Sequence, residues 1–202
     1  MNARVAVLAS GEGTNLQALL DDSEVGPRVA LVVSDRSGAR ALERARAAGA
    51  EAFHLDPAAH PTREAHDASL LALLRDRTID LVCLAGYMRI LGPVLVRAYR
   101  GRMLNVHPSL LPAFPGAHAV RDALDWGVKV TGVTVHLVDE EVDHGPIVAQ
   151  EVVPVQEGDD EASLHARIQD TEHRLYPACV RAVIEGRLSI EGRRALLKDP
   201  VR

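Results

Sequence analysis

The chain has 202 residues, of which 47% are hydrophobic and 25% are charged, and its formal net charge is -5 at pH 7. This length and composition can build a substantial core in one large domain or two small ones. The negative charge argues against a general binder of nucleic acid or of anionic membranes, because both functions need a basic surface. We therefore expect neither nucleic acid nor membrane as a partner.

Cysteine usage and the first residues point to an intracellular protein. Cys83 and Cys179 are the only cysteines, and neither belongs to a CxxC pair, so zinc and redox motifs are absent. Residues 1–10 lack the apolar core of a signal peptide, and no apolar run approaches the length of a membrane span, about 20 residues. We expect a cytoplasmic location and no disulfide.

The first hundred residues alternate short apolar runs with amphipathic stretches. The pattern predicts strands at 5–9, 29–33, 52–55 and 81–85, and helices at 15–20, 39–48 and 63–77. Apolar runs of this length fit strands that are buried on both faces of a parallel sheet. The fold class is therefore α/β, a doubly wound, mostly parallel sheet with helices on both faces.

The pattern changes after Gly101. We predict a strand at 103–107 that leads into a stiff loop with three prolines, then strands at 130–139 and 147–154 and helices at 119–126 and 163–185. Pro177 should kink or break the last helix, and the charged tail from Arg187 should be weakly ordered. We expect a single domain, 1–202, with an N-terminal half of about 1–100 and a C-terminal half of about 101–202.

A glycine-containing loop follows the first predicted strand, Ser10-Gly11-Glu12-Gly13-Thr14-Asn15. Glycines let the backbone approach an anion, and the N-terminus of the following helix offers free N–H groups. Leu16 replaces the third glycine of a GxGxxG motif and no Walker lysine follows, so one phosphate fits better than a dinucleotide or triphosphate. An ordinary strand-to-helix turn, capped by Thr14 or Asn15, remains an alternative.

Asn105 and His107 alternate along a predicted strand, so both side chains lie on the same side. A carboxamide can donate to a developing oxyanion, and a histidine can transfer protons near neutral pH. Asp143 lies in a Gly- and Pro-containing turn after a later strand. Beside His107, its carboxylate would raise the histidine pKa. The alternatives are a structural histidine at a strand end and a solvated turn aspartate.

Four segments, at 10–17, 85–91, 105–112 and 143–147, together make the sequence similar to one family. Over nearly the whole chain it resembles the glycinamide ribonucleotide formyltransferases, small folate-dependent enzymes of purine synthesis. The resemblance implies the formyltransferase fold with a Rossmann-like N-terminal half. The Asn, His and Asp constellation alone would indicate only the wider formyltransferase superfamily.

The resemblance also implies roles for individual residues. The catalytic residues would be Asn105, His107 and Asp143. The ribonucleotide and its phosphate would contact Gly13, Thr14, Asn15, Gln169, Asp170, Thr171 and Glu172. Folate would contact Arg63, Met88, Arg89, Ile90, Leu91, Asn105, Asp139, Glu140, Glu141, Val142 and Asp143. Glu12 puts a carboxylate in the phosphate loop and should point away from the phosphate.

The reaction implied by the resemblance is one-carbon transfer in purine biosynthesis. A formyl group would pass from the cosubstrate 10-formyltetrahydrofolate to the amine of glycinamide ribonucleotide, with Asn105 and a protonated His107 stabilising the oxyanion. No metal is expected, and the protein could be a monomer or a homodimer.

Three rivals remain. A methionyl-tRNA formyltransferase resembles this core but carries an extra C-terminal domain, and a formyltetrahydrofolate deformylase carries an N-terminal regulatory domain. The chain length disfavours both. A non-catalytic folate- or nucleotide-binding module is disfavoured by the complete Asn105, His107 and Asp143 set.

Overall fold

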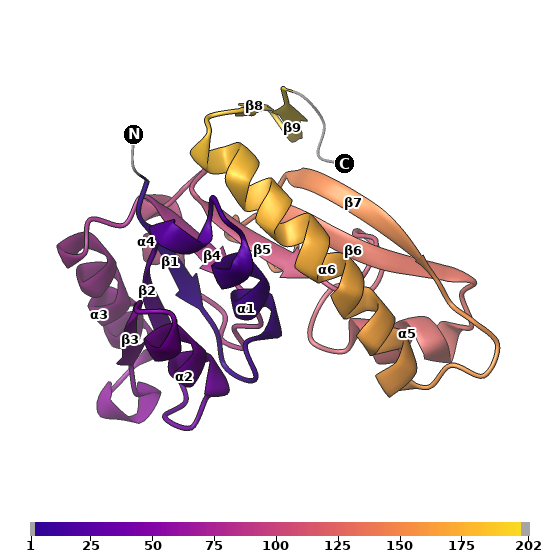
Figure 1. Ribbon diagram of the computed structural model, residues 1–202, viewed down its shortest axis with the longest axis horizontal. Coiled ribbons are helices and arrows are strands. Elements are labelled where there is room, and N and C mark those ends of the chain that lie inside the picture. Colours follow the sequence, from indigo (N-terminus) through magenta and orange to yellow (C-terminus); the bar gives the residue numbers. More distant parts are fainter. Residues whose placement is uncertain (1–2, 199–202) are drawn as a thin grey trace. The chain divides into compact units, whose positions relative to one another are not determined.

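The computed structural model describes residues 3–198 (Figure 1). The strands are β1 (Val5–Leu8), β2 (Val29–Ser34), β3 (Glu51–His54), β4 (Leu81–Leu84), β5 (Met103–His107), β6 (Val130–Leu137), β7 (Ile147–Pro154), β8 (Leu188–Glu191) and β9 (Arg194–Leu197). The α-helices are α1 (Thr14–Asp21), α2 (Arg40–Ala47), α3 (Arg63–Asp76), α4 (Pro93–Ala98), α5 (Ala119–Trp126) and α6 (Glu161–Ile184). Short 3-10 turns lie at Gly26–Arg28 and Pro57–Ala59.

Seven strands form one sheet in the order β3-β2-β1-β4-β5-β6-β7. Strand β1 pairs in parallel with β2 and β4, and β2 pairs in parallel with β3, whereas β6 and β7 are antiparallel. The predicted α/β fold with a mostly parallel sheet is confirmed. By its internal contacts the chain divides into two compact units, Met1–Leu104 and Asn105–Arg202, so the division falls inside β5.

The first unit has a core built from its central strands. Every residue of β1 and β4 is buried, whereas β3 at the sheet edge alternates exposed and half-buried positions. Helices α1, α2 and α3 bury their apolar faces, which consist mainly of leucine and alanine. Burial on both faces explains why these strands are continuous apolar runs in the sequence.

In the second unit, α6 packs against β6 and β7 (Figure 1). All residues of β6 except Val130 are buried, and Leu164, Ile168 and Tyr176 lie on the buried face of α6. The helix begins at a capping box in which Asp160 and Ser163 satisfy each other's backbone N–H groups. This packing fixes the β6–β7 hairpin, which carries part of the candidate site.

Predicted and observed element bounds for residues 5–185 differ by at most two residues. Helix α4 was not predicted: it is short, and it begins at Pro93 after Gly92, whose N–H donates to the buried Asp67 carboxylate at 2.6 Å. A Pro-Val-Leu-Val sequence carries little helical signal without that tertiary contact.

Two predictions about the C-terminal part need correction. Helix α6 continues through Pro177, so the predicted break is wrong, whereas a kink there stays a prediction. Residues 188–197 form the antiparallel β8–β9 hairpin, and β9 contacts β7, so the prediction of a weakly ordered tail is wrong for this segment. Because this segment contains many charged residues, the sequence pattern did not predict its two four-residue strands. Residues 199–202 of the predicted tail lie outside the described residues.

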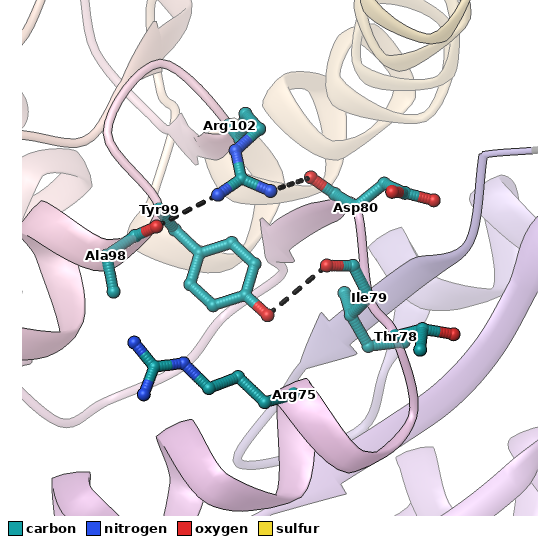
Figure 2. Close-up of a pocket in the computed structure, with 7 residues that line it drawn as sticks. All are labelled: Arg75, Thr78, Ile79, Asp80, Ala98, Tyr99 and Arg102. Atoms are coloured by element: carbon teal, nitrogen blue, oxygen red, sulfur yellow. Dashed lines mark hydrogen bonds between the residues drawn. The ribbon is translucent and has the colours of Figure 1, made fainter.

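A pocket of about 310 Å³ lies beside the start of β4 in the first unit (Figure 2). The Tyr99 side chain there is buried, and its hydroxyl donates to the carbonyl oxygen of Ile79 at 3.3 Å. The Arg102 guanidinium lies 4.9 Å from the Tyr99 ring centre and donates to the carbonyl oxygens of Asp80 and Ala98. Burial raises the pKa of Tyr99. These contacts fasten the end of α4 to the segment before β4.

We expect Tyr99→Phe to lower the free energy of unfolding by about 1 kcal/mol, because the buried Ile79 carbonyl loses its donor. Tyr87→Phe is the matched control, because the Tyr87 hydroxyl is buried without a hydrogen-bond partner within residues 3–198. Its removal should leave stability unchanged or slightly higher. Urea unfolding of both variants measures the difference, and equal losses would contradict the assignment.

Candidate active site

Three polar side chains meet at the end of β5 in the second unit. The Nδ1 atom of His107 lies 3.4 Å from Oδ2 of Asp143, and Nδ2 of Asn105 donates to Oδ1 of Asp143 at 3.4 Å. Alternation along β5 brings Asn105 and His107 to the same side, and the turn after β6 supplies the carboxylate. The solvated-turn alternative for Asp143 is wrong, because only 9% of its side chain is exposed.

A fourth side chain, His136, belongs to the same cluster. Its Nδ1 lies 2.9 Å from the Leu137 carbonyl oxygen, and its Nε2 lies 3.1 Å from Nδ2 of Asn105. The same Nε2 lies 3.6 Å from Oδ1 of Asp143, so the ring contacts both Asn105 and Asp143. The sequence pattern alone did not single out His136 as a site residue. The available signal was a histidine at a buried position of β6, just before the turn that carries Asp143.

The pKa of His107 is lowered, chiefly because burial disfavours the charged imidazolium, although Asp143 acts in the opposite direction. The predicted rise was therefore wrong in its net direction, since it considered the carboxylate and not the loss of solvent. The Nε2 atom lies 2.8 Å from the Phe114 carbonyl oxygen. Because a carbonyl oxygen only accepts, Nε2 of His107 carries a proton, and the lowered pKa favours the neutral form of the ring.

Asp143 is held as a carboxylate. Burial would raise its pKa, but hydrogen bonding with His136, the Gly116 N–H and the nearby His107 together lower it. The Gly116 N–H donates to Oδ2 at 2.7 Å. The backbone of Asp143 has φ 53°, a left-handed conformation that costs a non-glycine residue about 1–2 kcal/mol. Several contacts therefore hold this carboxylate in one direction.

The proline-rich loop after His107 is fastened to the β6–β7 hairpin. The Thr134 hydroxyl donates to the Ser109 carbonyl oxygen at 2.7 Å and accepts from the Leu111 N–H at 3.0 Å. Gln150 donates to the Leu111 carbonyl oxygen and to the Thr134 hydroxyl, each at 2.9 Å. The stiff loop expected from its prolines is thus anchored by side chains of β6 and β7, which place the Phe114 carbonyl and the Gly116 N–H at the site.

The glycine loop in the first unit begins α1 without a side-chain cap. Gly13 is the N-cap residue, with φ 69°, so the alternative of a turn capped by Thr14 or Asn15 is wrong. The Glu12 carboxylate pairs with Arg40 at 3.3 Å, and the backbone carbonyl oxygen of Glu12 accepts a hydrogen bond from Arg44 Nε at 2.9 Å. The Glu12 carboxylate is thus engaged with Arg40, and the N-cap residue Gly13 contributes no side-chain hydrogen bond to the start of α1.

The positions expected to contact folate and ribonucleotide are divided between the units. In the first unit Met88 and Ile90 are each 61% exposed, and the Met88 N–H donates to Ser10 Oγ at 2.9 Å. In the second unit Val142 is 54% exposed. Exposed apolar side chains suit the contact of a flat ring. The proximity of these positions to the Asp143 cluster stays a prediction.

The remaining expected contacts are polar. Arg63 is the first residue of α3, directly after the N-cap Thr62, and is exposed. In the segment expected to contact the ribonucleotide, Gln169 is half-buried, Asp170 is exposed, and Thr171 and Glu172 are buried. Only one face of α6 is therefore open to a ligand over 169–172.

Within residues 3–198, the structure offers neither a metal-binding cluster nor a membrane-spanning helix. No group of three or more histidine, cysteine, aspartate or glutamate side chains is arranged to hold a metal ion in this part of the chain. None of its helices combines the length and the apolar character needed to cross a membrane.

Comparison with known proteins identifies the family. The sequence model of the formyl transferase family matches residues 3–180 of this chain. The chain belongs to this family. A phosphoribosylglycinamide formyltransferase of Mycobacterium tuberculosis H37Rv is 50% identical over 197 residues, which cover 96% of this chain and 91% of that protein.

Solved structures agree with this placement. The glycinamide ribonucleotide transformylase 1 of Symbiobacterium toebii is 55% identical and superposes with a TM-score of 0.95 over 98% of this chain and 94% of its own. A formyltetrahydrofolate deformylase from Pseudomonas syringae is 31% identical with a TM-score of 0.90, and the match covers 98% of this chain but 67% of that one. The chain is thus a formyltransferase-family enzyme that uses the fold of these relatives, and the family implies a folate-type formyl donor.

Gly13→Ala should lower the free energy of unfolding by about 1–3 kcal/mol, because Gly13 has a left-handed backbone and a Cβ there would lie 2.9 Å from Ala41 of α2. Gly11→Ala is the matched control in the same loop, since a Cβ at Gly11 has nothing within 4 Å. Denaturant unfolding measures both, and equal stabilities would contradict the packing argument. A bulky residue at position 13 is therefore unsuited to a test of phosphate binding.

Proposed function

We propose that this enzyme transfers the formyl group of 10-formyltetrahydrofolate to the amine of glycinamide ribonucleotide in purine biosynthesis. The observation that carries the proposal is the buried cluster of Asn105, His107, His136 and Asp143, in a chain 50% identical to a phosphoribosylglycinamide formyltransferase. The cluster offers a proton carrier, a carboxylate and an amide donor within one unit, which is the set that acyl transfer to an amine requires.

The reaction begins when the substrate amine attacks the formyl carbon. A new C–N bond forms, the carbonyl oxygen gains negative charge, and the attacking nitrogen becomes positively charged. His107, neutral in the free enzyme, accepts the proton that this nitrogen loses. The imidazolium so formed, stabilised by Asp143, donates a proton to N10 as the C–N10 bond breaks. The products are formylglycinamide ribonucleotide and tetrahydrofolate.

Asn105 supplies the donor for the oxyanion. Its Nδ2 atom lies 3.1 Å from His136 Nε2 and 3.4 Å from Asp143 Oδ1, so the bond to Asp143 is the longer of the two. The N–H group of the longer bond is the one that turns toward the developing oxyanion, while His136 keeps the amide in place. A donor of this kind typically contributes about 3 kcal/mol to transition-state stabilisation.

Substrate binding is assigned by the same proposal. The backbone N–H groups of Gly13, Thr14 and Asn15 hold the phosphate at the start of α1, and the 169–172 segment of α6 contacts the ribonucleotide. Folate lies against Arg63, the 88–91 segment and the 139–143 loop. The exposed apolar side chains of Met88, Ile90 and Val142 support the folate assignment.

The rival activities differ in the acceptor of the formyl group. A deformylase uses water, a tRNA formyltransferase uses an aminoacylated tRNA, and a binding module has no acceptor. The identity to the phosphoribosylglycinamide relative, 50%, exceeds the 31% identity to the deformylase, and the match covers 91% of that relative but only 67% of the deformylase. The net charge of -5 favours a small acceptor over a tRNA. A cytoplasmic location, and a monomeric or homodimeric state without metal, complete the proposal.

The test is an assay with 10-formyltetrahydrofolate, with and without glycinamide ribonucleotide. We expect tetrahydrofolate to form only when the ribonucleotide is present. His107→Ala should lower kcat at least about a hundredfold and leave folate binding largely intact, because it removes the proton carrier and no folate-contacting side chain. Formate release without ribonucleotide would indicate a deformylase, and normal turnover in His107→Ala would remove His107 from the mechanism.

Asp143→Asn should lower the pKa of His107 further, because the carboxylate is what opposes the effect of burial. The neutral imidazole is the form that accepts a proton, so kcat/KM falls as pH drops through the His107 pKa. This acid limb should move to lower pH in the variant, and kcat should fall because the imidazolium loses its partner. NMR titration of His107 measures the pKa directly, and an unchanged or raised value would show that Asp143 is not its electrostatic partner.

A further inference from the structure

The turn of the β8–β9 hairpin reaches the loop that carries Asp143. Gly192 and Arg193 form this turn, between the paired residues Glu191 and Arg194. The Arg193 guanidinium lies 2.8 Å from His144 Nε2, and its second terminal nitrogen donates to the His144 carbonyl oxygen at 2.7 Å. One arginine thus contacts both the ring and the backbone of the residue that follows Asp143.

These contacts hold the ring of His144. One terminal nitrogen of Arg193 lies 2.8 Å from His144 Nε2 and 3.3 Å from Nδ1, so the guanidinium lies against the ring beside both nitrogens. The Nδ1 atom lies 2.8 Å from Asp139 Oδ2, so it carries the proton and donates it to that carboxylate. His144 is therefore fixed at three atoms, Nδ1, Nε2 and the carbonyl oxygen, by one partner within its own loop and one from the C-terminal hairpin.

The position of His144 controls Asp143 through the backbone. Asp143 has φ 53°, and Gly145, on the other side of His144, approaches so closely that a Cβ there would lie 1.8 Å from the Leu137 carbonyl oxygen. The Leu137 N–H also donates to the Pro146 carbonyl oxygen at 2.9 Å. These contacts fix the C-terminal side of the loop at Gly145 and Pro146. If His144 loses its contacts, the segment that can change conformation therefore runs from the end of β6 to His144.

We propose that Arg193 is a positioning residue for the reaction, which holds the loop after β6 so that the Asp143 carboxylate faces His107. The claim rests on the proposed function of Asp143. The hairpin can bear this role because β9 contacts β7, and because the N–H of Lys198 and the carbonyl of Arg187 close its stem at 2.9 Å. A single exposed ion pair would contribute little to holding the loop. Here both terminal nitrogens of Arg193 contact His144, which follows the strained backbone of Asp143.

The experiment uses the full chain with Arg193→Ala, and Arg194→Ala as the matched control. Arg194 is the next residue, carries the same charge, and makes no side-chain hydrogen bond or ion pair within the described residues. We expect Arg193→Ala to lower kcat about threefold to tenfold, with the KM for glycinamide ribonucleotide unchanged. Arg193→Lys, which keeps the positive charge and one donating nitrogen, should recover part of the lost kcat, and Arg194→Ala should behave as wild type.

Two NMR measurements need no substrate and so test the proposal separately from the proposed function. The backbone amide resonances of residues 139–144 should coincide in wild type and in Arg194→Ala, and should shift in Arg193→Ala. The pKa of His107 should fall in Arg193→Ala relative to Arg194→Ala, because Asp143 moves away. Loss of positive charge alone would act in the opposite direction, raising the pKa.

A His107 pKa in Arg193→Ala that equals or exceeds that in Arg194→Ala would overturn the proposal, as would unchanged amide resonances of residues 139–144. Absence of formyl transfer in the wild-type enzyme would instead reject the proposed function and leave the NMR comparison to decide the role of Arg193.

Discussion

A carboxylate that is 9% exposed needs partners for both oxygens, and the second unit is organised to supply them to Asp143. Oδ2 receives the Gly116 N–H and lies next to the His107 ring, while Oδ1 receives the Asn105 amide. These partners come from β5 and from the loop that follows it. Since an unpaired buried charge would cost several kcal/mol, each of these segments must be in place before the carboxylate can occupy its position.

The same requirement explains why the β6–β7 hairpin is built as it is. Thr134 and Gln150 do not reach Asp143, but they hold the proline-rich loop through the backbone of Ser109 and Leu111. A Cβ at Gly132 of β6 would collide with the Glu151 carbonyl oxygen of β7 and would also press on the Leu110 side chain, so a glycine is needed there chiefly for β6 and β7 to pair closely. The β6–β7 hairpin therefore holds the loop whose Gly116 N–H donates to Asp143, and the turn between β6 and β7 supplies Asp143 itself.

Local patterns were sufficient to predict most of the fold. The apolar runs of β1 and β4 and the length of α6 follow from burial and periodicity within a few neighbouring residues. Helix α4 depends on Asp67 accepting the Gly92 N–H, 25 residues away, and the β8–β9 hairpin depends on contact with β7. Neither dependence can be read from a local window of sequence.

The candidate site divides in the same way. Alternation on β5 was enough to place Asn105 and His107 together, but the membership of His136 depends on the pairing of strands that are distant in sequence. The direction of the His107 pKa was also beyond local reasoning, because burial is a property of the whole unit. Sequence identified the chemical groups, whereas the balance between desolvation and Coulomb attraction required the three-dimensional environment.

In the proposed mechanism, that balance lets one histidine serve both halves of the reaction. Burial disfavours the imidazolium, so the neutral ring would be ready to accept a proton before substrate arrives. The Asp143 carboxylate and the oxyanion then both favour the charged ring once the amine has attacked. Because desolvation and the two negative charges act with opposite sign, the proton moves to His107 only when the tetrahedral intermediate is present, and it leaves again when the oxyanion collapses and N10 becomes basic. A fully solvated histidine would lack the first property, and a buried histidine without Asp143 would lack the second.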